Sequence, residues 1–345
     1  VYQSEDFRTW QSPGHRFWQD SDHFFYLQQT FQTASKRARG VDIAAQNKRR
    51  AEIERELARL QIASRTRSAY WDAAAAERVR NLYLEILDNF RQITAYHDAR
   101  VREGVMAEAD LIRIQLEQEK IEIAANTASL DAQRATIRLL REMGRLDYSA
   151  VPRLDPPWEM AILPGREPSL DDALNRRPEL QLARQILKLN DAQTAYQMAM
   201  AKPNVDGVFG YKRSKNFDTV MWGVQVPLPV FNRNQGNIES AVAERRAGEA
   251  AVRSTESLIR AEHQAAVLEI EIRRRQLREA VGPLRDRARR TAQIADSAYR
   301  LGGADLLRLL DAQRQRIDAE LLYIGTLQGY LQAVVALDAA AGVIP

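Results

Sequence analysis

The residues that could carry out catalysis or bind a metal are few in this sequence. Cysteine is absent, and no nucleophile–base pair, glycine-rich phosphate loop or metal-ligand spacing stands out. His15 and His23 lie close to Asp20 and Asp22, which suggests a metal site, but a polar loop of this kind is more simply solvated. The sequence therefore predicts no catalytic residue, no cofactor and no bound metal.

Carboxylates recur just after two glycines that end long helical segments. Asp110 stands six residues after Gly104, and Asp311 stands nine residues after Gly302. An acidic residue in this position can cap a helix or be solvated at its positive end. What else these carboxylates do depends on the elements that carry them.

The composition argues against nucleic-acid binding and against membrane helices. The 50 basic and 46 acidic residues nearly balance, and the basic ones alternate with glutamate instead of clustering. No run of about 18 apolar residues occurs, so no transmembrane helix is predicted. The chain starts at Val1 without a signal peptide, so we expect a preceding segment, and whether it carries a lipidated cysteine is left open.

The first half of the chain predicts a helical hairpin of unusual length. Residues 14–151 contain no proline, which permits very long helices. Apolar residues at spacings of three and four predict one helix over Thr33–Arg102, packed as a coiled coil. Gly104 breaks it, and a returning helix runs from about Ala107 to Gly144.

A proline-rich connector and a capped helix follow. Residues 145–168 contain five prolines and predict an irregular segment. Ser169, with Asp172 three residues later, has the spacing of a capping box. The helix that it begins should reach about Met200, with a break at Pro178.

The second half of the chain predicts a second hairpin. A long helix over Asn232–Tyr299 should be interrupted at Gly282-Pro283, then turn at Gly302-Gly303 and return to Gly342. Proline removes a helical hydrogen bond and bends the helix. The first half has Leu82-Tyr83 near the equivalent point, so we expect the second hairpin to be the more deformable one.

An internal repeat relates the two halves. Gly104 and Gly144 are 40 residues apart, and so are Gly302 and Gly342, at an offset of 198. This spacing predicts that the chain contains two copies of one unit, which consists of a strand, a long helix, a glycine turn and a returning helix. By the same logic, the first copy should have a helix like the one that begins at Ser169, located before Val1.

Short alternating segments predict strands that lead into the long helices. The three predicted strands are Ser21–Phe31, Val205–Lys212 and Thr219–Leu228. Val1–Asp22 is otherwise loop-like, and Arg213–Asp218 is a polar turn. Pro227 and Pro229 remove ladder donors, so the sheet should end there. The equivalent junction, Gln28–Lys36, has no proline and predicts a smoother bend.

Four strands per chain would leave open sheet edges, whereas three copies supply twelve strands, enough for a membrane barrel continued by a tube of helices. One face of each strand would then meet lipid and the other the lumen. The lipid-facing set is Trp222, Val224, Val226, Leu228, Phe209 and Tyr211, and the lumen-facing set is Gln225, Asp206 and Lys212.

With these elements in order, the chain resembles the outer membrane efflux protein family, the TolC-like channels. The resemblance covers essentially the whole chain. The motifs that carry it are VQVPLPVFNRNQGNI, YLQQTFQTASKRARG, NRRPELQLAR, AMAKPNV, REGVMAEADLIRIQ and YRLGGADLLRLLDAQR. The TASKRARG segment looks most like the branch associated with heavy-metal efflux.

The resemblance implies a mainly α homotrimer in the outer membrane of a Gram-negative bacterium. Residues 1–31 and 204–229 would form a 12-stranded barrel, residues 32–144, 169–203 and 230–342 a periplasmic helical barrel, and residues 145–168 an equatorial region. The implied partners are a periplasmic adaptor protein, an inner-membrane efflux pump and outer membrane lipid. No chemistry on the substrate and no nucleic acid are implied.

The resemblance also assigns residues. Pore or gate candidates are Asp110, Asp311, Tyr299, Arg308, Asp305 and Glu108, because a carboxylate repeated in a trimer becomes a ring that favours cations. Tyr299 would link neighbouring hairpins, with Asp110 as its partner, or would simply pack in the helical seam. Arg308 departs from the family pattern, because the repeat would place a carboxylate there opposite Asp110, and it would instead pair with a nearby aspartate. Gly104, Val105, Gly302 and Gly303 would meet the adaptor. Pro227, Pro229, Phe231 and Phe31 would mark the barrel-to-helix junction.

Two other functions are weighed against the channel. A periplasmic adaptor or coiled-coil scaffold also uses long helical hairpins, but it would have one hairpin in a small β-domain instead of two fed by strands. An enzyme is disfavoured by the absence of a catalytic constellation.

Overall fold

The computed structural model describes residues 1–5, 14, 16–148, 154, 158, 168–214 and 217–343. The chain forms two compact units. The first consists of Val1–Glu54 and Glu179–Thr255, and the second of Arg55–Pro178 and Glu256–Pro345. The helices α2 (Lys36–Arg102) and α6 (Gln235–Arg275) each contribute residues to both units.

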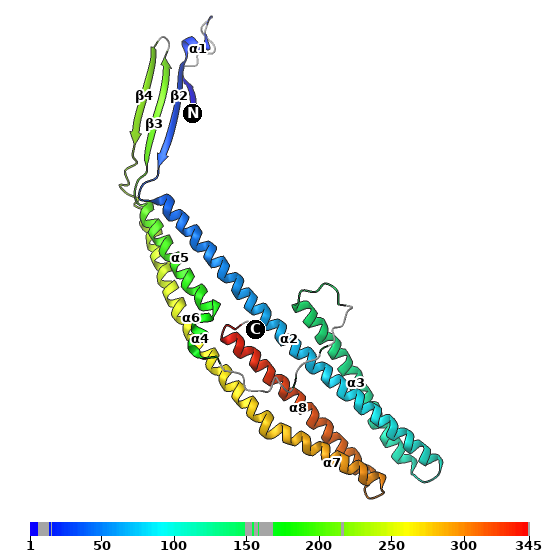
Figure 1. The fold of residues 1–345 in the computed structure, drawn as a ribbon. Helices are drawn as coiled ribbons and strands as arrows, with labels where there is room; N and C mark the ends of the chain where they lie inside the picture. The colour runs from blue at the N-terminus through cyan, green and yellow to red at the C-terminus, as the bar shows by residue number, and fades with distance from the viewer. Residues whose placement is uncertain are drawn as a thin grey trace. The chain divides into compact units, whose positions relative to one another are not determined.

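The first unit carries an antiparallel sheet in the order β1-β2-β3-β4 (Figure 1). Its strands are β1 (Tyr2–Glu5), β2 (Asp22–Phe31), β3 (Val205–Ser214) and β4 (Phe217–Gln225). The three strands predicted from alternation are present, but the third ends at Gln225 and not at the predicted Leu228, so Val226 and Leu228 lie outside the sheet. β4 ends two residues before Pro227. This is expected, because proline has no N–H to donate to the hydrogen-bond ladder of the sheet.

Two sequence predictions about the sheet region are wrong. Residues 1–22 are not loop throughout, because β1 pairs with β2 and a short helix, α1, spans Phe17–Asp20. β1 has only four residues, too few for alternation to identify it. The polar turn is also shorter than predicted, since Ser214 is already paired with Phe217.

The register of β3 and β4 sorts side chains as the alternation predicts. Phe209 lies opposite Trp222, and both are exposed apolar side chains on one face. On the other face Asp206 lies opposite Gln225 and also accepts a hydrogen bond from Thr30. On β3 and β4, the face with Phe209 and Trp222 is therefore apolar and exposed, and the face with Asp206 and Gln225 carries polar groups.

The two strand-to-helix junctions differ in a way that the sequence did not predict. Between β2 and α2 the chain turns within residues 32–35, and Ala34 and Ser35 both take positive φ, at 54° and 58°. Between β4 and α6 the chain uses residues 226–234, with positive φ at Asn234. The predicted smoother bend at the first junction is wrong. Tertiary bonds account for the tight turn, because Thr33 and Lys36 donate to the carbonyls of Pro203 and Lys202.

The helices confirm the internal repeat. α3 (Glu108–Glu142) and α8 (Leu306–Ala340) each contain 35 residues and are offset by 198. α2 ends at Arg102 and α7 (Gly282–Arg300) ends at Arg300, at the same offset. The long helix before the second turn is divided into α6, a π-helical turn η2 (Gln276–Val281) and α7. The predicted interruption at Gly282-Pro283 is therefore confirmed.

The capped helix is confirmed as well. Ser169 caps α4 (Leu170–Arg176) in a capping box with Asp172, and a separate helix, α5 (Pro178–Met200), begins at Pro178. The predicted connector over residues 145–168 lies largely outside the described residues.

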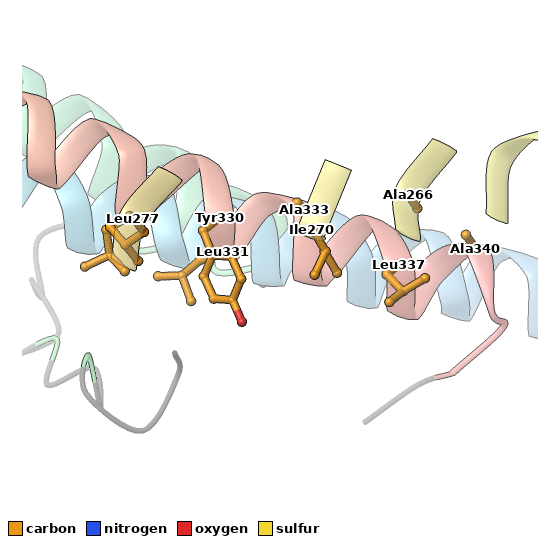
Figure 2. Close-up of a cluster of buried hydrophobic side chains, with 9 residues drawn as sticks. Ala266, Ile270, Leu277, Tyr330, Leu331, Ala333, Leu337 and Ala340 are labelled. Carbon is orange, nitrogen blue, oxygen red and sulfur yellow. The ribbon is translucent and has the colours of Figure 1, made fainter. Parts of the chain in front are cut away.

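Two of the apolar clusters among the described residues of the second unit involve α8. One joins α6, η2 and α8 through Ile270, Leu277, Leu331 and Tyr330, as Figure 2 shows. The other lies nearer the turns and joins α2, α3 and α8; its fully buried members include Ile114 and Leu309. Among the described residues, no helix is long and apolar enough to cross a membrane.

Candidate functional site at the hairpin turns

The two hairpin turns are closed by the same pair of backbone hydrogen bonds. In the first, the N–H groups of Gly104 and Val105 donate to the carbonyls of Val101 and Arg100. In the second, those of Gly302 and Gly303 donate to Tyr299 and Ala298. This is the Schellman cap, which needs a left-handed residue at its centre, and Gly104 and Gly302 have φ of 73° and 77°.

Each turn presents an apolar side chain to solvent. Val105 is 60% exposed in the first turn, and Leu301 is 87% exposed in the second. Gly303, unlike Gly302, does not need a positive φ. The residues predicted to contact an adaptor therefore lie in accessible turns.

Just above the turns, a hydrogen bond joins the two hairpins. The hydroxyl of Tyr299 on α7 is paired with Nε2 of His97 on α2, and the two rings stack with centroids 5.5 Å apart. His97 is fully buried, and its Nδ1 lies 2.7 Å from the carbonyl oxygen of Ile93. A carbonyl only accepts, so Nδ1 must donate. In the neutral ring, Nε2 then accepts a hydrogen bond from the Tyr299 hydroxyl.

The partner of Tyr299 differs from the sequence prediction. Its hydroxyl bonds to His97, whereas Asp110 acts on it through charge. Burial raises the pKa of Tyr299 above its usual range, and the negative charge of Asp110 raises it further, while Arg100 opposes both. Tyr299 therefore stays protonated and available as a donor.

His97 is the site residue that the sequence analysis missed. A signal was present, since His97 continues the spacing of Ile86, Phe90 and Ile93, which are buried apolar residues of α2. A histidine at such a position needs a partner for its ring nitrogens. The partner itself could not be predicted, because Tyr299 lies 202 positions away.

A cavity of about 340 Å³ lies beside this pair, between α2 and α7. Tyr96 lines it and accepts a hydrogen bond of 2.6 Å from Arg100, while Asp296 lines it and pairs with Arg300 at 2.9 Å. Tyr96 and Asp296 therefore bond to neighbours on their own helix, whereas His97 and Tyr299, which also line the cavity, bond to each other.

A second cavity of about 570 Å³ lies between α3 and α8 and gathers three of the predicted gate residues: Asp305, Arg308 and Asp311. Glu117 and Arg314 line it too and form an ion pair across the helices. Burial raises the pKa of Glu117, but hydrogen bonds from Arg314 and Lys120 outweigh burial and lower that pKa below its usual range.

The acidic gate candidates have local roles within the chain. Asp305 caps α8 by accepting from the backbone N–H of Arg308 at 2.8 Å, which is a helix cap and not the predicted pairing with the Arg308 side chain. Asp311 accepts from Gln315 at 2.9 Å. Glu108 and Asp110 lie in the first turn of α3, where the helix dipole favours acidic residues.

The predicted junction residues lie far along the chain from these turns. Phe31 ends β2, and Pro227, Pro229 and Phe231 follow β4, with Phe31 and Phe231 58% and 94% exposed. Within the described residues, no group of three or more histidines, aspartates or glutamates is arranged to hold a metal ion.

Comparison with known proteins gives three kinds of match: a relative in sequence, solved structures and a protein family. The chain is 27% identical over 256 residues to the cobalt-zinc-cadmium resistance protein CzcC of Cupriavidus metallidurans, covering 70% of this chain. The match spans 58% of CzcC, so the chain corresponds to less than two thirds of the length of that relative.

Solved structures share the fold. A membrane protein from Pseudomonas aeruginosa superposes with a TM-score of 0.80 at 21% identity, covering 99% of this chain and 80% of that one. The structure of CusC superposes with a TM-score of 0.82 at 16% identity, covering 99% and 83%. Finally, residues 169–343 match the family described as outer membrane efflux protein. Because this match covers more than half of the chain, the chain belongs to the outer membrane efflux protein family.

Proposed function

We propose that the chain is the outer membrane duct of a tripartite efflux system. Three copies form a passive conduit that an inner-membrane pump drives through a periplasmic adaptor, and the chain itself performs no chemical step. The observation that carries this proposal is the construction of two matched hairpins, each fed by a strand of a sheet with an exposed apolar face, in a member of this family.

The proposal assigns parts of the chain to places. Residues 1–31 and 204–229 form the barrel in the outer membrane, and residues 145–168 an equatorial region. Residues 32–144, 169–203 and 230–342 form the periplasmic helical barrel. Phe31 and Phe231 then lie at the membrane surface, where aromatic side chains are enriched.

The hairpin turns act as the gate and the adaptor contact. The bond between His97 and Tyr299 ties the second hairpin to the first, which supports a role in holding the narrow end closed. Asp110 and Asp311, repeated in three copies, add rings of negative charge that favour cations. Divalent metal ions are the proposed cargo, and the similarity to a cobalt-zinc-cadmium resistance protein supports that choice.

The proposal is tested by membrane fractionation followed by native mass spectrometry and planar-bilayer recording. We expect the protein in the outer membrane, as a trimer with a cation-selective conductance. Asp311→Asn should lower the cation preference, and Asp286→Asn, on an exposed face of α7, serves as the control. A soluble monomer would contradict the duct and favour the scaffold alternative.

A further inference from the structure

Both strand-to-helix junctions of the first unit meet at the C-terminal end of one helix, α5. At the first junction, Nζ of Lys36 donates to the carbonyl of Lys202 and to the side-chain oxygen of Asn204. At the second, the side-chain amide of Asn234 donates to the carbonyl of Gln197, in the last turn of α5, at 2.8 Å. The two junctions accordingly lie beside each other in Figure 1. Segments about 200 residues apart along the chain therefore form one surface.

This surface, which we call the junction surface, consists of residues 31–40, 197–204 and 226–236, and its charged side chains are all basic. It contains five basic residues and no acidic one, whereas the whole chain has 50 basic and 46 acidic residues. The five are Lys36, Arg37, Arg39, Lys202 and Arg233. A cluster of one sign attracts a ligand of the opposite sign.

Four of the five charges are accessible. Arg37, Arg39, Lys202 and Arg233 are exposed, and among the residues that the structure describes none of them has an ion-pair partner. Lys36 is buried and bonds to neutral oxygens, so its charge adds to the positive potential while its side chain holds the surface together. The junction surface can therefore bind an anion without first breaking an ion pair.

The junction surface also presents large apolar side chains to solvent. Leu228, Val230 and Phe231 follow β4 and are 79%, 63% and 94% exposed. Phe31, at the end of β2, is exposed as well. Neighbouring exposed apolar side chains of this size mark an interaction surface. The partner must therefore be apolar and anionic at the same time.

The order of these groups identifies the kind of partner. Phe31 precedes Arg37 by six residues, and Phe231 precedes Arg233 by two, so at both junctions the apolar side chain lies on the sheet side and the basic one on the helix side. The sheet continues the apolar character through exposed residues such as Trp222. The same change, from apolar through aromatic to basic, matches the acyl chains, interface and phosphates of a bilayer.

We propose that the junction surface binds anionic phospholipid in the membrane leaflet that faces the periplasm. Leu228 and Phe231 contact the acyl chains, and Arg37, Lys202 and Arg233 contact the phosphate of the headgroup. This inference rests on the proposed function, which places Phe231 at the membrane surface. A zwitterionic phospholipid has the same phosphate but no net charge, so it should bind more weakly.

Native mass spectrometry of the detergent-solubilised trimer tests this preference. Phosphatidylglycerol and phosphatidylcholine with the same acyl chains are titrated in separate samples. We expect phosphatidylglycerol to bind more tightly by about five-fold, the effect of one basic residue at an anionic surface, or by more if several contribute. In the triple variant Arg37→Gln/Lys202→Gln/Arg233→Gln, the two lipids should bind equally. Arg233→Gln alone should lower the preference part of the way, which keeps the test decisive if the triple variant assembles poorly.

A matched variant controls for net charge. Lys188→Gln/Arg246→Gln/Arg253→Gln removes the same charge from exposed positions of α5 and α6, more than two helical turns from the junction surface, and should keep the preference. Equilibrium dialysis with inorganic phosphate separates lipid from free anion. We expect no saturable phosphate binding, because the acyl chains supply part of the affinity.

The outcomes separate this inference from the proposed function. Equal binding of the two lipids by the wild-type trimer overturns the lipid site and leaves the duct intact. Loss of the preference in the control triple variant also overturns the site, because net charge would then set the preference. Saturable binding of inorganic phosphate that the junction triple variant abolishes overturns the lipid as the ligand. Absence of any wild-type trimer overturns the proposed function itself.

Discussion

The two hairpins have matched turns and returning helices but differ in the helix that leads to each turn. α2 runs unbroken from Lys36 to Arg102, whereas its counterpart changes to a π-helical turn at Gln276–Val281 before α7. In that turn the N–H of Gly282 donates to the carbonyl of Leu277, five residues back. Pro283, which has no N–H, follows directly.

This difference shows which features of a repeat are free to change. The equal turns make the ends of the two hairpins alike, while the π-helical turn gives the second hairpin an interruption that the first does not have. A Cβ at Gly282 would come within 3.0 Å of the Leu277 carbonyl oxygen, so glycine suits this π-helical bond. We infer that the second hairpin moves when the duct opens and the first stays in place.

The largest expected effect comes from breaking the packing between hairpins. Ile114→Ala removes a fully buried side chain from the cluster shared by α2, α3 and α8, and should cost about 2–5 kcal/mol of unfolding free energy. Chemical denaturation in detergent measures it. Ile112→Ala, two positions away and 49% exposed, is the matched control. Equal losses for the two variants would contradict the assigned core.

The equivalence of the turns is tested by glycine substitution. Gly104→Ala and Gly302→Ala each force alanine into a left-handed conformation, and each should cost about 1–2 kcal/mol. Gly303→Ala should be nearly neutral, because its Cβ would meet only the Ala298 carbonyl oxygen at 3.6 Å. Clearly different losses at Gly104 and Gly302 would show that the turns are not equivalent.

The ion pair between α3 and α8 gives a pH dependence. The pKa of Glu117 is lowered, so its contribution is present above the usual glutamate pKa of about 4.3 and is lost as pH falls through the lowered value. Glu117→Gln should lower stability by about 1 kcal/mol at pH 7 and by progressively less as the pH falls below about 4.3. Melting temperatures of both proteins across this range measure the effect, and parallel curves would refute it.

The smallest expected change in stability is at Pro283. Pro283→Ala restores a backbone donor and should change the unfolding free energy by no more than about 1 kcal/mol. It should nevertheless lower the opening frequency of single channels in a bilayer, because the second hairpin becomes straighter and stiffer. Unchanged opening and unchanged adaptor binding would remove the support for a deformable second hairpin.

The sequence predicts most of the local structure. Glycine spacing located all four Schellman caps, at Gly104, Gly144, Gly302 and Gly342, each with positive φ. Ser169 and Asp172 predicted the capping box, and Gly282-Pro283 predicted the interruption. In each case a few neighbouring residues determine the local backbone conformation, because their side chains, or the lack of one, restrict it.

Features that depend on distant residues were missed. Ala34 and Ser35 adopt a conformation that neither prefers, and bonds to residues about 170 positions away accompany it. β1 is a strand because β2 pairs with it, and its own four residues carry no clear pattern. His97 finds Tyr299 through packing of the two hairpins, which no local motif encodes.

The most direct test of a moving second hairpin is the single-channel conductance of Tyr299→Phe. This change removes the hydroxyl that bonds to His97 and keeps the ring. Tyr96→Phe is the control, since the Tyr96 hydroxyl accepts from Arg100 of the same helix. We predict a larger or more frequently open conductance for Tyr299→Phe and wild-type behaviour for Tyr96→Phe. Identical conductance for wild type and Tyr299→Phe would contradict the account.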